Sequence, residues 1–275
     1  AMAAGSADRL LPKSFPPFGK MIVGIAVENW VRYLIFAGIA WLLAYVLFKK
    51  RMWSRKIIQR DPSTADMRRE FGWSTLTVVI YGLVGAGTIW LAKHGWTQMY
   101  WKIDERGMPW FWSTVVLAIV VHDAYFYWTH RWMHHRRLFR WFHLVHHEST
   151  NPSPWAAYCF APLEAVVQAG IFPFLVIVMP IHPLAMLPFM FWQITFNVVG
   201  HTGYEIHPRW LMDSWLGRFI NTPTNHIQHH ERHGCNYGLY FNYWDRLMNT
   251  NHPGYESRYR EVTSRSATYA KPASG

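Results

Sequence analysis

Nine histidines stand out as residues whose type and spacing could bind metal ions. They form one pair with the spacing His-x-x-x-His, two triplets with the spacing His-x-x-His-His, and one single position. Residues three and four positions apart lie on the same face of a helix, so each cluster would present its imidazoles together. The nine are His130, His134, His143, His146, His147, His201, His226, His229 and His230.

This number of imidazoles indicates more than one metal ion. Neutral imidazole is a good ligand for iron, zinc and copper, and nine nitrogens exceed what one metal can accept, so we expect two metals. The clusters contain no cysteine and few carboxylates, which disfavours a structural zinc finger. His122 and His233 are candidate further ligands, since each lies close to a cluster along a helix. An isolated histidine is usually an ordinary interfacial residue, whereas the repeated spacing favours metal binding.

Long apolar segments must position these clusters. Runs of roughly 20 residues, the length of a helix that crosses about 30 Å of hydrocarbon, lie near residues 21–48, 73–92, 109–132, 162–180 and 183–200. The first run contains Glu28 and Arg32, so we expect only its part from Tyr33 to Phe48 to lie in the membrane core. It is also too long for the hydrophobic region of a cleavable signal peptide. A short turn with two prolines separates the last two runs and predicts a tight hairpin or a re-entrant pair.

Basic residues predict the orientation of these helices. Many of the 27 Lys and Arg lie between the first two apolar runs, at 49–69, and the positive-inside rule makes this loop cytoplasmic. Counting spans onward, every histidine cluster reaches the same side, and the hairpin at 162–200 lets the two triplets meet in space. The net charge of +11 would also suit nucleic acid, but the basic residues flank apolar runs, so nucleic-acid binding is disfavoured.

The sequence therefore predicts an all-α, polytopic membrane protein with about four to five transmembrane or re-entrant helices. A cytoplasmic, histidine-rich helical cap would hold a site for two metals. We divide the chain into an N-terminal segment, N-terminal transmembrane helices with a basic cytoplasmic loop, a histidine-box catalytic region and a C-terminal tail. These parts cover residues 1–20, 21–108, 109–258 and 259–275.

The order of the clusters resembles the fatty acid hydroxylase and sterol desaturase superfamily over about 109–252. The pair, a short gap, the first triplet, two apolar runs and the second triplet follow one another as is typical of that superfamily. The segments 201–205 and 244–250 are also similar to family elements, with one departure at Asn249, where the family commonly has Gly. The gap between the first two clusters is too short for a membrane crossing, unlike the gap in acyl-CoA desaturases.

The resemblance implies an enzyme whose histidines bind two iron ions, with zinc as a substitute in purified protein. Such an enzyme reduces O2 and oxidises an unactivated C–H bond of a fatty acyl, sphingoid or sterol-like lipid. We expect hydroxylation, with desaturation by the same centre as the alternative. A histidine-lined metal transporter or sensor is less favoured, because its ionisable residues would be spread through the membrane helices rather than collected at one side.

Two further sets of residues are expected to support this chemistry. The second ring nitrogen of a metal-bound histidine commonly donates to an acceptor, and the nearby candidate acceptors are Asp123, Glu148, Glu205 and Asp245. The chain has no haem, flavin or Fe–S motif, so lipid oxidation requires an external electron donor of ferredoxin or cytochrome type with its reductase. We expect the acidic face of that donor to dock on basic residues beside the clusters, namely Arg131, Arg136, Arg137 and Arg140.

Overall fold

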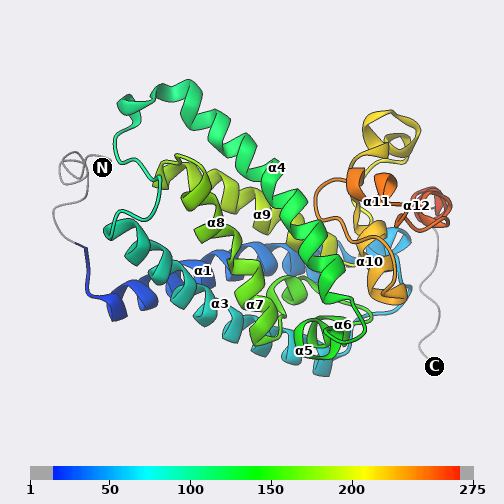
Figure 1. The fold of residues 1–275 in the computed structure, drawn as a ribbon. Helices are drawn as coiled ribbons and strands as arrows, with labels where there is room; N and C mark the ends of the chain where they lie inside the picture. The colour runs from blue at the N-terminus through cyan, green and yellow to red at the C-terminus, as the bar shows by residue number, and fades with distance from the viewer. Residues whose placement is uncertain (1–14, 267–275) are drawn as a thin grey trace.

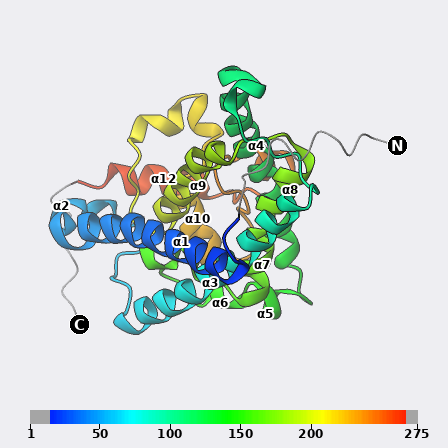
Figure 2. The same cartoon turned by 90° about the vertical axis from the view of Figure 1, so that its left-hand side faces the viewer.

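The computed structural model describes residues 15–266, and their regular structure is helical (Figure 1). Over these residues the only β-type pairings are the isolated bridges Lys56–Tyr204 and Ile220–Phe241. Long helices run side by side, and short helices gather at one end of them (Figures 1 and 2). The prediction of an all-α fold is confirmed.

Four helices are long and apolar enough to cross a membrane, namely Phe18–Leu47, Thr64–Lys93, Gly107–Met133 and Pro183–His201. The first consists of α1 (Phe18–Trp41) and a π-helical end (Leu42–Leu47), the next two are α3 and α4, and the last contains α9 (Met186–His201). The remaining predicted run forms two shorter helices, α7 (Pro162–Ala169) and α8 (Ile171–Val178). The predicted number of transmembrane or re-entrant helices is confirmed.

The first membrane helix is longer than predicted. It begins at Phe18 and passes through Glu28 and Arg32 without a break. The Arg32 guanidinium donates to the Glu28 carboxylate one turn away and to Oδ1 of Asn29 at 2.6 Å. Because the helix pairs its own charges, they do not force it out of the apolar bundle.

The second membrane helix also begins before the apolar run that predicted it. The hydroxyl of Ser63 accepts a hydrogen bond from the N–H of Asp66 at 3.0 Å and so caps α3, which starts at Thr64. The first two turns of α3 are polar, so hydropathy alone placed its start near residue 73.

Small residues let α1 and α3 pack closely. A Cβ atom added at Gly82 would lie 2.7 Å from the carbonyl oxygen of Ile22, and one added at Gly85 would lie 3.0 Å from the Ile25 side chain. Close backbone approach is how membrane helices gain packing contacts, because the lipid around them is as apolar as their side chains. The loop between these two helices contacts the segment that follows α9, where the N–H of Ile57 donates to the carbonyl oxygen of Gly203.

The short helices form the cap, at the end of the bundle opposite the start of α1 (Figure 1). They are α2 (Lys49–Met52), α5 (Phe139–Phe142), α6 (Leu144–His147), α10 (Pro223–Arg232), α11 (Tyr243–Leu247) and α12 (Tyr255–Ser264). Short 3-10 helices connect elements along the chain at Trp53–Arg55, Ile103–Glu105, Pro154–Tyr158, Pro183–Ala185, Arg209–Asp213 and Leu216–Arg218. The last turns of α4 and α9 reach this cap and carry histidines into it.

Candidate dimetal centre

Four segments bring the nine histidines together where the bundle meets the cap. The pair lies at the end of α4, His201 is the last residue of α9, and the triplets lie at α6 and on α10. The two triplets meet in space, as predicted, since Nε2 of His147 is 3.0 Å from Nε2 of His229. Eight of the nine side chains are buried, and His134 is half-buried.

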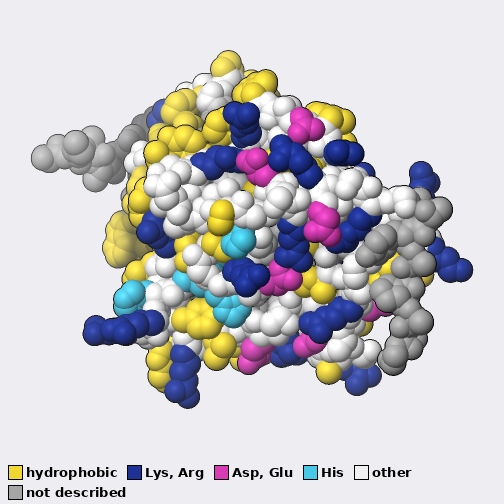
Figure 3. All heavy atoms as spheres, turned by 90° about the vertical axis from the view of Figure 1, so that its right-hand side faces the viewer, with side chains coloured by type: hydrophobic (Ala, Val, Ile, Leu, Met, Phe, Trp, Pro, Cys, Tyr) yellow, Lys and Arg dark blue, Asp and Glu magenta, His cyan; other side chains and the backbone are white. Residues whose placement is uncertain are grey.

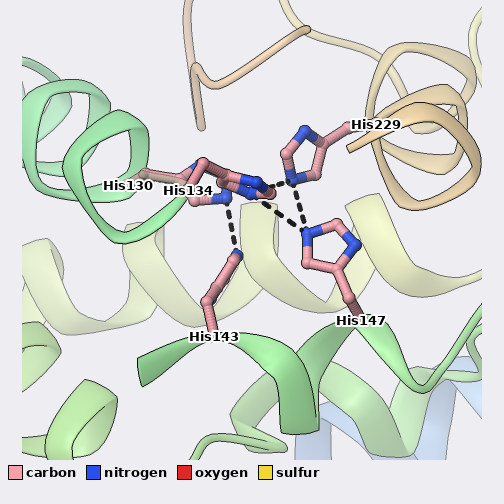
Figure 4. A group of neighbouring side chains, drawn as sticks. All are labelled: His130, His134, His143, His147 and His229. Carbon is pink, nitrogen blue, oxygen red and sulfur yellow. Dashed lines mark hydrogen bonds between the residues drawn. The ribbon is translucent and has the colours of Figure 1, made fainter. Parts of the chain in front are cut away.

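Five of them form the first group, called the five-histidine group (Figure 4). Its candidate ligand atoms all lie within 4.8 Å of one another. Nε2 of His147 is 3.1 Å from Nε2 of His134, and Nε2 of His130 is 2.9 Å from Nε2 of His143. Figure 4 shows these rings and that of His229 pointing toward one another from three separate parts of the chain.

The other four form the second group, called the four-histidine group. Nε2 of His201 is 2.9 Å from Nε2 of His226 and 3.3 Å from those of His146 and His230. Its ligand atoms also lie within 4.8 Å of one another. In each triplet the middle histidine belongs to one group and the two outer histidines belong to the other, so both triplets contribute to both groups.

Hydrogen bonds on the far side of the rings determine which nitrogen faces each group. Nδ1 of His146 lies 3.2 Å from the carbonyl oxygen of Cys159, and Nδ1 of His201 lies 2.6 Å from that of Asn197. A carbonyl only accepts, so each Nδ1 carries the proton and each Nε2 presents a lone pair. These two Nε2 atoms are 3.3 Å apart with no proton between them. Facing lone pairs repel, and a cation bound between them would remove the repulsion.

The five-histidine group repeats this arrangement. Nδ1 of His130 donates to the carbonyl oxygen of Tyr237 at 2.8 Å, and Nδ1 of His229 donates to that of Cys235 at 2.6 Å. Burial, and then the neighbouring imidazole of His130, holds the pKa of His229 well below its usual range, so the ring is neutral and able to act as a ligand. Neutral imidazoles in groups of five and four suit two ions of the iron or zinc type.

A carboxylate that was not among those expected from the sequence contacts the five-histidine group. Glu164 on α7 accepts a hydrogen bond from Nδ1 of His143 at 2.7 Å, and both side chains are fully buried. The carboxylates expected to support the site lie close to the histidines along the chain, whereas Glu164 is 21 residues from its partner. The available signal was that Glu164 is the only ionisable residue in the apolar run 162–180, a position where such residues are usually functional.

Comparisons with known proteins show which family the chain belongs to. The family described as Fatty acid hydroxylase matches residues 115–250, which contain all nine histidines. The chain is 31% identical over 217 residues to a Delta(7)-sterol 5(6)-desaturase of Gibberella zeae, a match that covers 77% of this chain and 63% of that protein. The chain belongs to the fatty acid hydroxylase and sterol desaturase superfamily.

Two further relatives share a lower identity with the chain. A second Delta(7)-sterol 5(6)-desaturase of Gibberella zeae is 25% identical over 227 residues, which are 81% of this chain and 61% of that protein. Lathosterol oxidase of Homo sapiens is 25% identical over 237 residues, which are 84% of this chain and 75% of that protein. The chain thus spans less than two thirds of the two Gibberella proteins. No solved structure matches it. Its four apolar helices and its superfamily make it an integral membrane protein.

In this superfamily member, two carboxylates that we expected to orient imidazoles bind backbone N–H groups instead. Oδ1 of Asp123 accepts from the N–H groups of Tyr240 and Phe241 at 3.1 and 3.2 Å. The carboxylate of Asp245 accepts from the N–H groups of Tyr237 and Gly238 at 2.8 and 2.7 Å. The reason is that this loop is buried without regular structure, so its N–H groups need acceptors. The carboxylates therefore hold the loop whose Tyr237 carbonyl orients His130.

The other two expected acceptors also differ from the prediction. Glu205 accepts from the N–H and hydroxyl of Thr224 at 3.1 and 2.7 Å, where the start of α10 favours a negative charge. Glu148 is exposed and faces Arg69 at 3.6 Å. Backbone carbonyls, rather than these two carboxylates, accept from several of the imidazoles. Glu205 supports the triplet of α10 indirectly, because it binds the start of the helix that carries the triplet. Glu148 has no histidine partner among its described contacts.

The two candidate further ligands lie outside both groups. Nδ1 of His122 is 2.7 Å from the hydroxyl of Tyr240. His233 has a left-handed backbone, with φ 59°, at the end of α10, and its ring packs on that of His147 with centroids 4.3 Å apart. His122 thus lies deeper in the bundle, and His233 packs against the five-histidine group from the end of α10.

Basic side chains surround the site on the cap. Arg136, Arg137 and Arg140 are exposed between α4 and α6, and Arg131 is half-buried with its guanidinium donating to the hydroxyl of Tyr127 at 3.2 Å. Figure 3 shows Lys and Arg side chains spread over this end of the molecule, with Asp and Glu among them. Three of the four arginines expected to meet a redox partner are therefore accessible.

Proposed function

We propose that this protein is a membrane-embedded di-iron oxidoreductase that uses O2 and external electrons to oxidise a C–H bond of a lipid. The observation that carries the proposal is the convergence of nine histidines in two groups, with ring lone pairs directed at one another. Zinc has no redox chemistry, so iron is the working metal. Zinc is expected to replace iron in purified protein, because it binds nitrogen donors more tightly than ferrous iron does.

The five-histidine group would hold one ion and the four-histidine group the other. When bound, the two irons would supply the reduction of O2 and the oxidation of an unactivated C–H bond. The chain's own residues contribute position and environment. Carbonyl acceptors hold His130, His146, His201 and His229 in the tautomer that ligates, and Glu164 does so for His143. Burial of these rings keeps bulk water away from the reacting atoms.

The substrate is proposed to be a lipid that reaches the site from the bilayer. The relatives are named for sterol desaturation and lathosterol oxidation, and these names favour a sterol-like substrate and desaturation. Hydroxylation of a lipid by the same centre is the alternative, supported by the name of the matching family. In either reaction O2 takes up four electrons, two from the lipid and two from an external donor.

Mass spectrometry of lipids from cells with and without the chain tests this function. Expression of the wild type should produce a lipid that has lost two hydrogens or gained one oxygen. A variant with His146 and His229 both replaced by Ala is the matched control, since it keeps the fold's apolar helices but removes one ligand from each group. If the two proteins leave the lipids equally unchanged while the wild type is folded and carries iron, the proposed activity is wrong.

We further propose that the donor docks on Arg136, Arg137 and Arg140 with an acidic face, and that this end of the molecule faces the cytoplasm. The basic loop that joins α1 and α3 lies at the same end, which supports that orientation. Changing the three arginines to Glu should slow turnover driven by the protein donor and leave turnover driven by dithionite unaltered. Lys102→Glu, in the loop that precedes α4, is the control. Equal donor-driven rates for all three proteins would remove the docking site.

A further inference from the structure

A charged side chain is buried at the middle of the first membrane helix. Arg32 is only 6% exposed, and its guanidinium donates to Glu28 and Asn29. Its Nε is buried without a hydrogen-bond partner among the described residues. An ionisable residue inside a membrane bundle is costly and usually functional. The free donor indicates that Arg32 does more than neutralise Glu28.

Arg32 lines a small polar pocket between the membrane helices, called the inner pocket. Asn29, Tyr158, Gln168 and Gln193 line it as well, and the Tyr158 hydroxyl donates to Oε1 of Gln193 at 3.2 Å. The pocket has a volume of about 10 Å³, which is near the lower limit for one water molecule. It therefore has room for a polar group of about the size of a hydroxyl.

A larger apolar cavity adjoins the inner pocket. It has a volume of about 170 Å³ and shares Asn29, Tyr81 and Phe172 with the inner pocket. Apart from Thr88 on α3, the rest of its lining is apolar and includes Ile25 of α1 and Met186 of α9. A cavity of this character between membrane helices suits the hydrocarbon part of a lipid.

The inner pocket is the end of this space that is connected to the metal-binding region. Nε2 of Gln168 is 3.5 Å from Oε1 of Glu164, and Glu164 accepts from His143 of the five-histidine group. A lipid with its polar group in the inner pocket and its chain in the apolar cavity would thus have the carbons near that polar group closest to the histidines.

Charge decides which polar group fits. Arg32 is already paired with Glu28, so a carboxylate buried in the pocket would be a second negative charge beside one guanidinium and would stay uncompensated. A hydroxyl both donates and accepts, as the amides of Asn29, Gln168 and Gln193 also do. We infer that Arg32 and these amides bind the hydroxyl group of a neutral lipid, which enters the bundle hydroxyl end first and is oxidised at carbons near that group. This inference rests on the proposed function.

Binding to the purified, metal-loaded full chain without reductant tests the inference separately from catalysis. The probes are cholesterol, its 3-methyl ether and oleate. A site built for a hydroxyl rejects analogues that lack it by large factors, so the wild type should bind cholesterol about tenfold or more tightly than the methyl ether, and oleate should compete poorly. Gln193→Met, which keeps side-chain volume, should bring the two sterols to nearly equal affinity. Thr195→Val, a similar polar-to-apolar change on the outer face of the same helix, should keep the wild-type preference.

Glu28→Gln with Arg32→Met removes the ion pair without leaving one charge alone, and this double variant should lose the preference in the same way as Gln193→Met. Equal wild-type affinities for the two sterols would overturn the inference, as would tightest binding of oleate or a wild-type preference in folded Gln193→Met protein. If the wild type oxidises lipids in cells yet shows no preference, only this inference fails. If it shows the preference but no lipid is oxidised, the proposed function fails.

Discussion

Replacement of Glu164 gives a quantitative test of how the five-histidine group is built. Glu164 accepts from Nδ1 of His143 at 2.7 Å, and the two side chains are 0% and 1% exposed. Loss of such an acceptor typically lowers metal affinity about 10- to 100-fold, or about 1.4 to 2.7 kcal/mol. Gln keeps a neutral acceptor, so Glu164→Gln should fall near the lower figure. Glu164→Leu leaves the His143 ring without an acceptor and should fall near the higher one.

The assay is competition of the metal-loaded protein with a chelator of known affinity. One of the two ions should be lost at lower chelator concentration in the variants, while the other follows the wild type. Glu148→Gln is the matched control, because Glu148 is exposed and adjacent to His147 in sequence but contacts Arg69 instead. If both Glu164 variants are folded and retain both ions with wild-type affinity, the assignment of Glu164 as the residue that positions His143 is refuted.

Three further predictions concern the site and the segment that supports it. Replacing His146 or His229 by Ala should each abolish product, and the double variant should be no worse than either, because the two groups act as a unit; near-normal product per bound iron in either single variant would argue against a shared centre. Gly203→Ala should lower the unfolding temperature strongly, since Gly203 has φ 72° and an added Cβ would collide with Nζ of Lys56. The control is Gly87→Ala, where an added Cβ would have no atom within 4 Å, and this change should leave the unfolding temperature unchanged or raise it. Burial lowers the pKa of Lys56 to about 7, so between pH 7 and about 10 the unfolded chain binds more protons than the folded chain, and the free energy of unfolding should rise with pH. Thermal melts of Lys56→Met should lack this rise. A pH profile identical to that of the wild type would contradict the prediction.

The histidines could be predicted from the sequence because their spacing is local. Helical periodicity places positions three and four apart together whatever the rest of the fold does, so the clusters were visible without a structure. The assignment of each ring to a group was not visible. The middle histidine of each triplet, His146 or His229, joins the other group because of where α4, α9 and α10 meet, which depends on contacts between distant segments.

The features that the sequence did not predict share a physical cause. Each depends on a partner distant in sequence or on a helix cap that lies outside the apolar pattern. Glu164 reaches His143 through the packing of α7 against the α5 to α6 segment. Arg32 remains inside the bundle because Glu28 and Asn29 bind it. Asp123 and Asp245 bind backbone N–H groups of an irregular loop, whose need for acceptors cannot be read from composition or hydropathy.

The central claim is that the nine histidines bind two ions, one in each group. The most direct measurement is the metal content of folded, full-length protein prepared with ferrous iron in the absence of oxygen, compared with a His201→Ala variant prepared in the same way. We expect two irons per wild-type chain and about one in the variant, since His201 lies only in the four-histidine group, within 3.3 Å of each of its other members. One iron or none in the folded wild-type chain would contradict the account.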